Sequence, residues 1–265
     1  MPRPGDVAGL SKELPAREAA HRLTAARLGD VRRCAETLVG APTADAVHDL
    51  RVAVRRLRAA LELFGAGDAW VDELKRLMAP LGSCRDAQLR LEWLKAAGAA
   101  RGALYREEER RLAVELPLAV ARVRAWLRAR PPAFETLARE LAPAGKFGGH
   151  RLRERLASLR GQVDRRAAKL DGAPDPRAAH QLRIRAKRLR YAAELLERAD
   201  PGPVHRLLRD LPHLQSLLGE LHDADVRVDW LSHATVASRA ERERLLERAQ
   251  ADRKRLARRL ERQLH

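Results

Sequence analysis

The chain has 265 residues, of which 45% are hydrophobic and 34% charged, and its formal net charge at pH 7 is +17. This length can bury one large core or two ordinary ones. The sequence contains no run of eighteen or more apolar residues, and its N-terminus lacks the apolar region of a signal peptide, so we expect a soluble, cytoplasmic protein.

Leu and Ala are abundant while aromatic residues make up only 3%, which favours helices over sheets. In chain order, apolar spacing and Gly/Pro punctuation predict helices over 16–39, 44–64, 69–97 and 101–129, and then over 150–171, 176–198, 203–233 and 236–264. A Pro/Gly-rich connector with one short helix separates the two sets. We therefore predict an all-α fold of two four-helix bundles, with an N-terminal half over 12–132, a connector over 133–146 and a C-terminal half over 147–265.

An internal duplication supports this division. At an offset of 132, "VHDLRVAVRRLRAALELF" (47–64) corresponds to "AHQLRIRAKRLRYAAELL" (179–196). Further along, "LGSCRDAQLRLEWL" (81–94) corresponds to "LGELHDADVRVDWL" (218–231) at an offset of 137, so five residues were inserted between the two blocks. A duplicated unit predicts two halves about a pseudo-twofold axis, with equivalent faces opposed.

The repeated helix carries a row of cations beside its apolar face. At about 100° per residue, Leu50, Val54, Leu57, Leu61 and Phe64 share the core side, as do Leu182, Ala186, Leu189 and Leu196. The neighbouring band defines the first stripe (His48, Arg51, Arg55, Arg58) and the second stripe (His180, Arg183, Lys187, Arg190), which end beside Glu62 and Glu194. Each stripe runs about 15 Å at 1.5 Å per residue, which suits several successive phosphates. A solvated helix face gives the same pattern for an isolated row, but here the row recurs in both copies around changed neighbours.

Composition supports a polyanionic partner. Of the 53 basic residues 46 are Arg, whose planar guanidinium binds phosphate in a bidentate manner, although a GC-rich genome would produce the same bias. Cys34 and Cys84 are widely spaced, and we interpret them as small helix-packing residues in a reducing compartment.

The later block adds a basic position to each half. Arg85 in "CRDA" corresponds to His222 in "LHDA", so this position keeps a potential cation. The His222–Asp223 dipeptide invites comparison with HD-type metal phosphohydrolases, but Arg in the sister copy argues against a metal ligand. Trp93 and Trp230 occupy matching places and are predicted to lie in the core.

These four blocks, in this order, resemble the CHAD family, the conserved-histidine α-helical domain. The resemblance implies two four-helix bundles around a basic central groove that binds inorganic polyphosphate, in proteins associated with polyphosphate granules. By position it implies that the polyphosphate-binding residues are His48, Arg51, Arg55, Arg58, Arg85, His180, Arg183, Lys187, Arg190 and His222. Many relatives are fused to a triphosphate-hydrolase domain, but this chain has no strand-borne E-x-E-x-K pattern.

The leading hypothesis is thus a non-enzymatic binder of long-chain polyphosphate that needs no cofactor and no metal. Two alternatives stay open. Non-specific nucleic-acid binding could follow from charge alone, although only Tyr191 among the aromatic residues interrupts the stripes, which gives base stacking little support. A metal-dependent phosphohydrolase would require paired carboxylates, and none stands out near the stripes.

Overall fold

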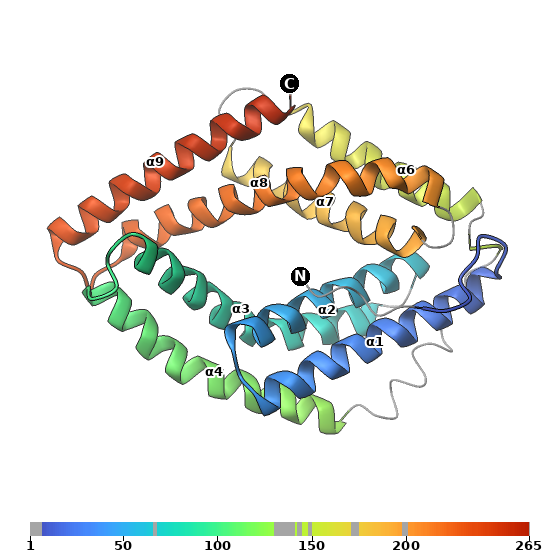
Figure 1. Cartoon of the computed structure of the whole chain (residues 1–265), viewed down its shortest axis with the longest axis horizontal. Helices are drawn as coiled ribbons and strands as arrows, with labels where there is room; N and C mark the ends of the chain where they lie inside the picture. Colours follow the sequence, from blue (N-terminus) through green and yellow to red (C-terminus); the bar gives the residue numbers. More distant parts are fainter. Residues whose placement is uncertain are drawn as a thin grey trace. The chain divides into compact units, whose positions relative to one another are not determined.

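In a computed structural model, residues 7–65, 68–129, 141, 145–147, 150–170, 175–197 and 201–264 are described. This part of the chain forms eight α-helices and no strand, apart from a single antiparallel bridge between Pro15 and Lys146 (Figure 1). The helices are α1 (Ala16–Gly40), α2 (Ala44–Phe64), α3 (Asp68–Ala96), α4 (Ala103–Ala129), α6 (His150–Ala167), α7 (Pro176–Leu196), α8 (Pro201–His233) and α9 (Arg239–Leu264). The all-α prediction is confirmed.

The helix bounds agree closely with those expected, and the differences have local causes. Gly98 adopts a positive φ of 73° just after α3, and α4 begins at Ala103 instead of residue 101. The hydroxyl of Ser238 accepts a hydrogen bond from the Glu241 backbone N–H (3.2 Å), so α9 begins at Arg239 and not at residue 236. The connector predicted over 133–146, with its short helix, lies largely outside the described residues.

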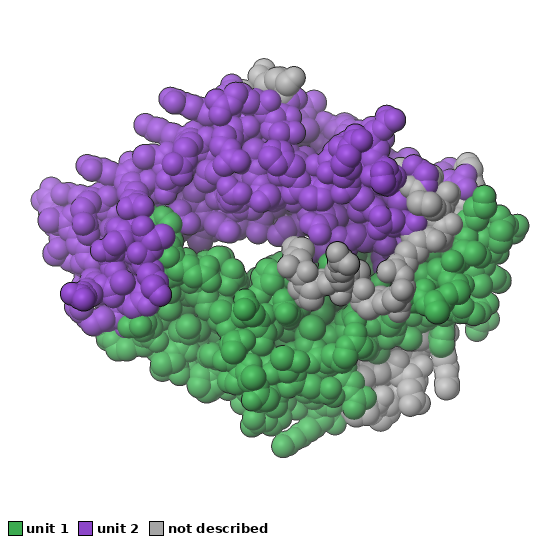
Figure 2. All heavy atoms as spheres, in the orientation of Figure 1, with its two compact units in different colours: residues 1–93, 108–152, 198–200 green, residues 94–107, 153–197, 201–265 purple. Residues whose placement is uncertain are grey.

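The chain separates into two compact units (Figure 2). Unit 1 comprises residues 1–93, 108–152 and 198–200, and unit 2 comprises residues 94–107, 153–197 and 201–265. Unit 2 thus includes the turn between α3 and α4, where a guanidinium nitrogen of Arg248 donates a hydrogen bond to the Ala96 carbonyl (3.2 Å).

The core of each unit follows the predicted apolar faces. Leu50, Val54, Leu57, Leu61 and Phe64 on α2 are all buried, as are Leu182, Ala186, Leu189 and Leu196 on α7. Each fully buried Leu contributes about 1.5–3 kcal/mol relative to an exposed one, so these faces fix how α2 and α7 are rotated. That rotation decides where the two stripes point.

The prediction for the tryptophans is wrong. Trp93 on α3 and Trp230 on α8 are only half-buried, whereas Trp126 on α4 is 7% exposed. An indole is amphipathic and can cover the rim of a core with its N–H group near water, so matching positions in two copies do not require full burial.

Candidate functional site

Both stripe helices begin at a capped turn. The Thr43 hydroxyl accepts a hydrogen bond from the Ala46 backbone N–H (3.1 Å), and a carboxylate oxygen of Asp175 accepts one from the Ala178 N–H (2.9 Å). These N-caps satisfy otherwise unpaired backbone donors and fix the first turn of α2 and of α7. All eight stripe residues are partly exposed, because their faces lie beside the buried apolar faces.

In unit 1, α3 brings Arg85 close to the beginning of the first stripe. Burial and the positive charges of Arg85 and Arg55 lower the pKa of His48, against the opposing effect of Asp49. Arg85 also forms an ion pair with Glu92, at 3.3 Å between their nearest atoms. The first stripe and Arg85 together create a positive potential that disfavours a proton on His48.

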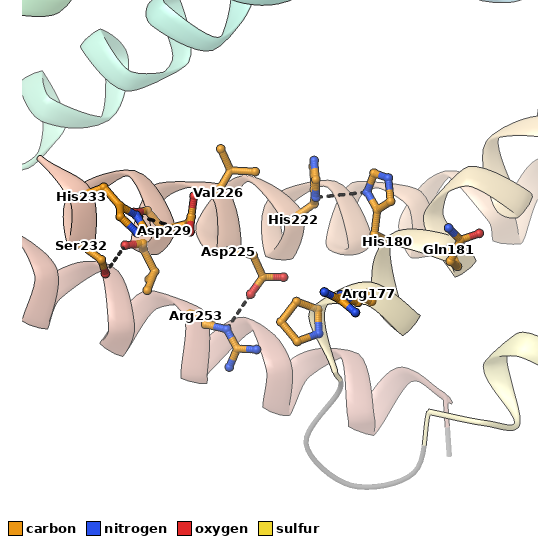
Figure 3. A pocket seen from close by; sticks show the side chains of 12 residues that line it. Arg177, His180, Gln181, His222, Asp225, Val226, Asp229, Ser232, His233 and Arg253 are labelled. Carbon is orange, nitrogen blue, oxygen red and sulfur yellow. Dashed lines mark hydrogen bonds and ion pairs between the residues drawn. The ribbon is translucent and has the colours of Figure 1, made fainter.

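Unit 2 brings the corresponding residues into direct contact. The Nδ1 atoms of His180 and His222 lie 3.3 Å apart, and the ring centroids are 4.6 Å apart at an interplanar angle of 36° (Figure 3). Burial, followed by the charge of Arg183, lowers the pKa of both histidines, with a further contribution from Lys187. For His222 the pKa falls to about 4, so His222 is neutral at pH 7 in the absence of a ligand.

The last cation of each stripe is compensated by an acid. Arg190 forms an ion pair with Glu194 (2.8 Å), and Arg58 forms the equivalent pair with Glu62 (3.5 Å). In contrast, Arg55 in the middle of the first stripe makes no hydrogen bond or ion pair with another described residue. The charge of Arg55 is therefore available to an anion, whereas the last cation of each stripe is partly neutralised.

Gln215 on α8 contacts the end of the second stripe. The sequence did not indicate this role of Gln215. Its side-chain amide donates to the Ala186 carbonyl (2.7 Å), and its amide oxygen accepts from an Arg190 guanidinium nitrogen (3.2 Å). Pro80 and Pro212 match at the offset of 132, so Gln215 falls among the five inserted residues that precede Leu218. It has no counterpart in the first half, and the duplication could not indicate it.

Substitution of Gln215 by Met tests this contact with little change in side-chain volume. We expect Gln215→Met to lower the free energy of unfolding by about 1 kcal/mol, since two hydrogen bonds are lost, one of them to a charged group, while an apolar side chain takes the buried place. Polyanion affinity should fall a few-fold, because Arg190 loses the hydrogen bond to Gln215 that helps to orient it. Urea denaturation and a binding titration measure the two effects. An unchanged affinity would show that Arg190 does not need this hydrogen bond.

A pocket of about 740 Å³ lies beside the two histidines in unit 2. Arg177 at the beginning of α7 and Arg253 on α9 line it together with His180 and His222 (Figure 3). Asp225 accepts a hydrogen bond from Arg253 (2.6 Å), and burial raises the pKa of this carboxyl although Arg253 opposes the shift. Arg177 and Arg253 were not predicted, because neither belongs to the repeated blocks.

Among the described residues, no group of three or more His, Cys, Asp or Glu side chains is arranged to hold a metal ion. Within the same part of the chain, none of the helices combines the length and apolarity needed to cross a bilayer.

Fold and site together define an all-α protein in which each unit carries a cationic stripe with a histidine at its beginning. A model of the CHAD domain matches residues 22–232, and the chain therefore belongs to the CHAD domain family. Its fold is similar to that in the crystal structure of the CHAD domain from the plant Ricinus communis, with a TM-score of 0.71, 23% sequence identity, and coverage of 97% of this chain and 90% of that one. No curated protein sequence matches the chain.

Proposed function

We propose that this protein binds inorganic polyphosphate through the first and second stripes. One observation carries the proposal: in addition to burial, Arg85 and Arg55 in unit 1 and Arg183 and Lys187 in unit 2 lower the pKa of the neighbouring histidines, so positive charge is concentrated where an anion would bind. Membership of the CHAD family supports the same ligand. A groove shared by the two stripes stays a prediction.

The chemistry of the stripes suits a linear chain of phosphates. Guanidinium, ammonium and imidazole groups follow one another along about 15 Å of helix, so each can donate to a different phosphate of one thread. Binding then releases the counterions of the polymer, and affinity should fall steeply with salt. The proposal includes association with polyphosphate granules in the cytoplasm, where the polymer is concentrated.

A titration with polyphosphate chains of defined length, repeated at two salt concentrations, tests the proposal. We expect affinity to rise with chain length until the stripes are filled, and then to level off. A competition with duplex DNA at equal phosphate concentration separates this function from non-specific nucleic-acid binding. We expect polyphosphate to stay bound. If DNA displaced it at an equal concentration of phosphate, the proposal that polyphosphate is the preferred ligand would be wrong.

We further propose that binding involves no hydrolysis of the polymer. Phosphate release measured with magnesium or manganese should stay at the level of the uncatalysed reaction. Release that rises in proportion to protein concentration would instead assign a phosphohydrolase.

A further inference from the structure

The outer face of α9 carries a second row of cations in unit 2. Six arginines lie within about 60° of one line along the helix, on the side opposite the buried residues Leu245, Ala249 and Leu260. We call them the arginine ridge: Arg244, Arg248, Arg255, Arg258, Arg259 and Arg262. All six are exposed, and from the first to the last the ridge extends about 27 Å at 1.5 Å per residue.

Acidic neighbours neutralise only part of the ridge. Arg255 pairs with Asp252 (2.9 Å) and Arg259 with Glu220 (3.6 Å). Arg244, Arg258 and Arg262 make no hydrogen bond or ion pair with any other residue in the described ranges. Over the whole helix Arg239–Leu264, ten basic and five acidic side chains leave a net charge of +5. Like charges at this spacing destabilise a helix, so the ridge has a cost in the free protein.

An arginine-rich composition does not by itself produce such a ridge. On α1, most arginines pair with acids of the same helix, among them Arg22 with Glu18, Arg32 with Glu36 and Arg33 with Asp30. Nor does the helix dipole explain it. The dipole favours cations only in the last turn, where Arg262 lies, and its effect does not extend to Arg244 and Arg248.

The ridge is separate from the second stripe. Arg253 lies on the opposite side of α9 from the ridge, and it pairs with Asp225 in the pocket beside His180 and His222 (Figure 3). The thickness of α9, about 10 Å, therefore stands between the ridge and the second stripe. A short thread bound on the second stripe cannot touch the ridge at the same time.

We propose that the arginine ridge is a second polyphosphate-binding surface, which makes the protein multivalent and able to cross-link long chains. This inference rests on the proposed function. A flexible single thread can follow a straight row of guanidinium groups along its whole length. A rigid duplex crosses such a row only over the width of a groove, about 12 Å for the major groove of B-DNA, so the geometry favours the thread.

The test compares two quadruple variants with the same loss of charge. The ridge variant is Arg244→Gln, Arg248→Gln, Arg258→Gln, Arg262→Gln. The control replaces four exposed arginines of unit 1 that do not form one row: Arg17→Gln, Arg122→Gln, Arg124→Gln, Arg128→Gln. Each protein is titrated with a short polyphosphate to obtain the number of bound chains, and light scattering follows the mixture with a long polyphosphate.

We expect the ridge variant to bind fewer short chains per protein. With long chains, the intensity of scattered light should be at least about fivefold lower than for the unmodified protein. The control should behave like the unmodified protein in both measurements. In the ridge variant, the slope of log affinity against log salt concentration should become less steep by up to about 3, because four cations no longer contact phosphates. If the ridge variant matched the unmodified protein in stoichiometry and scattering, the inference would be wrong while the proposed function stood. If the variant lost only duplex DNA binding, the ridge would be a nucleic-acid surface instead. If the unmodified protein bound no polyphosphate, both proposals would fall.

Discussion

The double variant Arg55→Glu, Lys187→Glu is expected to lose about 100-fold in affinity for a short polyphosphate chain. These residues occupy the same position in the first and second stripes, where the charge of Arg55 is uncompensated by any described residue. In each stripe the substitution removes a charge-assisted hydrogen bond of about 1.5–3 kcal/mol and adds a carboxylate that repels phosphate. Each stripe is therefore expected to lose about 3 kcal/mol, or roughly two powers of ten in its dissociation constant. The other cations of the stripes and the arginine ridge are expected to account for the binding that remains.

The loss should be specific to binding, because both side chains are partly exposed and neither lies on the apolar face of its helix. Circular dichroism should therefore show an unchanged helical content. A matched control is Arg122→Glu, Lys169→Glu, which reverses one exposed charge on α4 and one just after α6. If Arg55→Glu, Lys187→Glu bound polyphosphate normally, or if the control lost as much affinity, the stripes would not be the polyphosphate-binding site.

The positions of the stripes could be predicted because apolar periodicity determines how a helix is rotated. Once Leu50, Leu57 and Leu61 are assigned to the core, the neighbouring band on which Arg51 and Arg55 lie follows from helix geometry, and the structure buries the assigned residues fully. The same reasoning placed the second stripe. Comparison of two copies within one chain strengthened it, because the band is retained while its neighbours differ.

The parts that sequence could not predict depend on contacts between helices. Gln215 belongs to an insertion, so no repeat pointed to it, and its role depends on how α8 packs against Arg190 on α7. Similarly, the spacing of His180 and His222 in the sequence, 42 residues, says nothing about their 3.3 Å contact. Burial also lowers the pKa of both histidines, and the degree of burial is a property of the fold.

This pKa shift leads to the last prediction: binding of polyphosphate should become tighter as the pH falls from 7.5 to 5. Without a ligand, His222 has a pKa of about 4 and stays neutral over this range. Bound phosphates would offset the charges of Arg183 and Lys187 and raise the pKa of His222, so that binding takes up a proton. If phosphates restored the ordinary value of about 6.5, affinity would rise about 25-fold between pH 7.5 and pH 5.

The sign differs for the free protein, which distinguishes this coupling from a general effect of pH. In the unfolded chain His222 titrates at its ordinary pKa, so between about pH 6.5 and 4 the unfolded state binds more protons. The stability of the free protein therefore decreases as the pH is lowered from about 6.5 to 4. Two substitutions isolate the residue. His222→Gln cannot take up the proton and should show a flatter dependence of affinity on pH. His222→Arg, which places at this position the residue found at Arg85, is permanently charged and should bind tightly at pH 7.5 with an equally flat profile. If His222→Gln kept the full 25-fold rise, the coupled proton would belong to another group, because glutamine has no titratable proton to contribute.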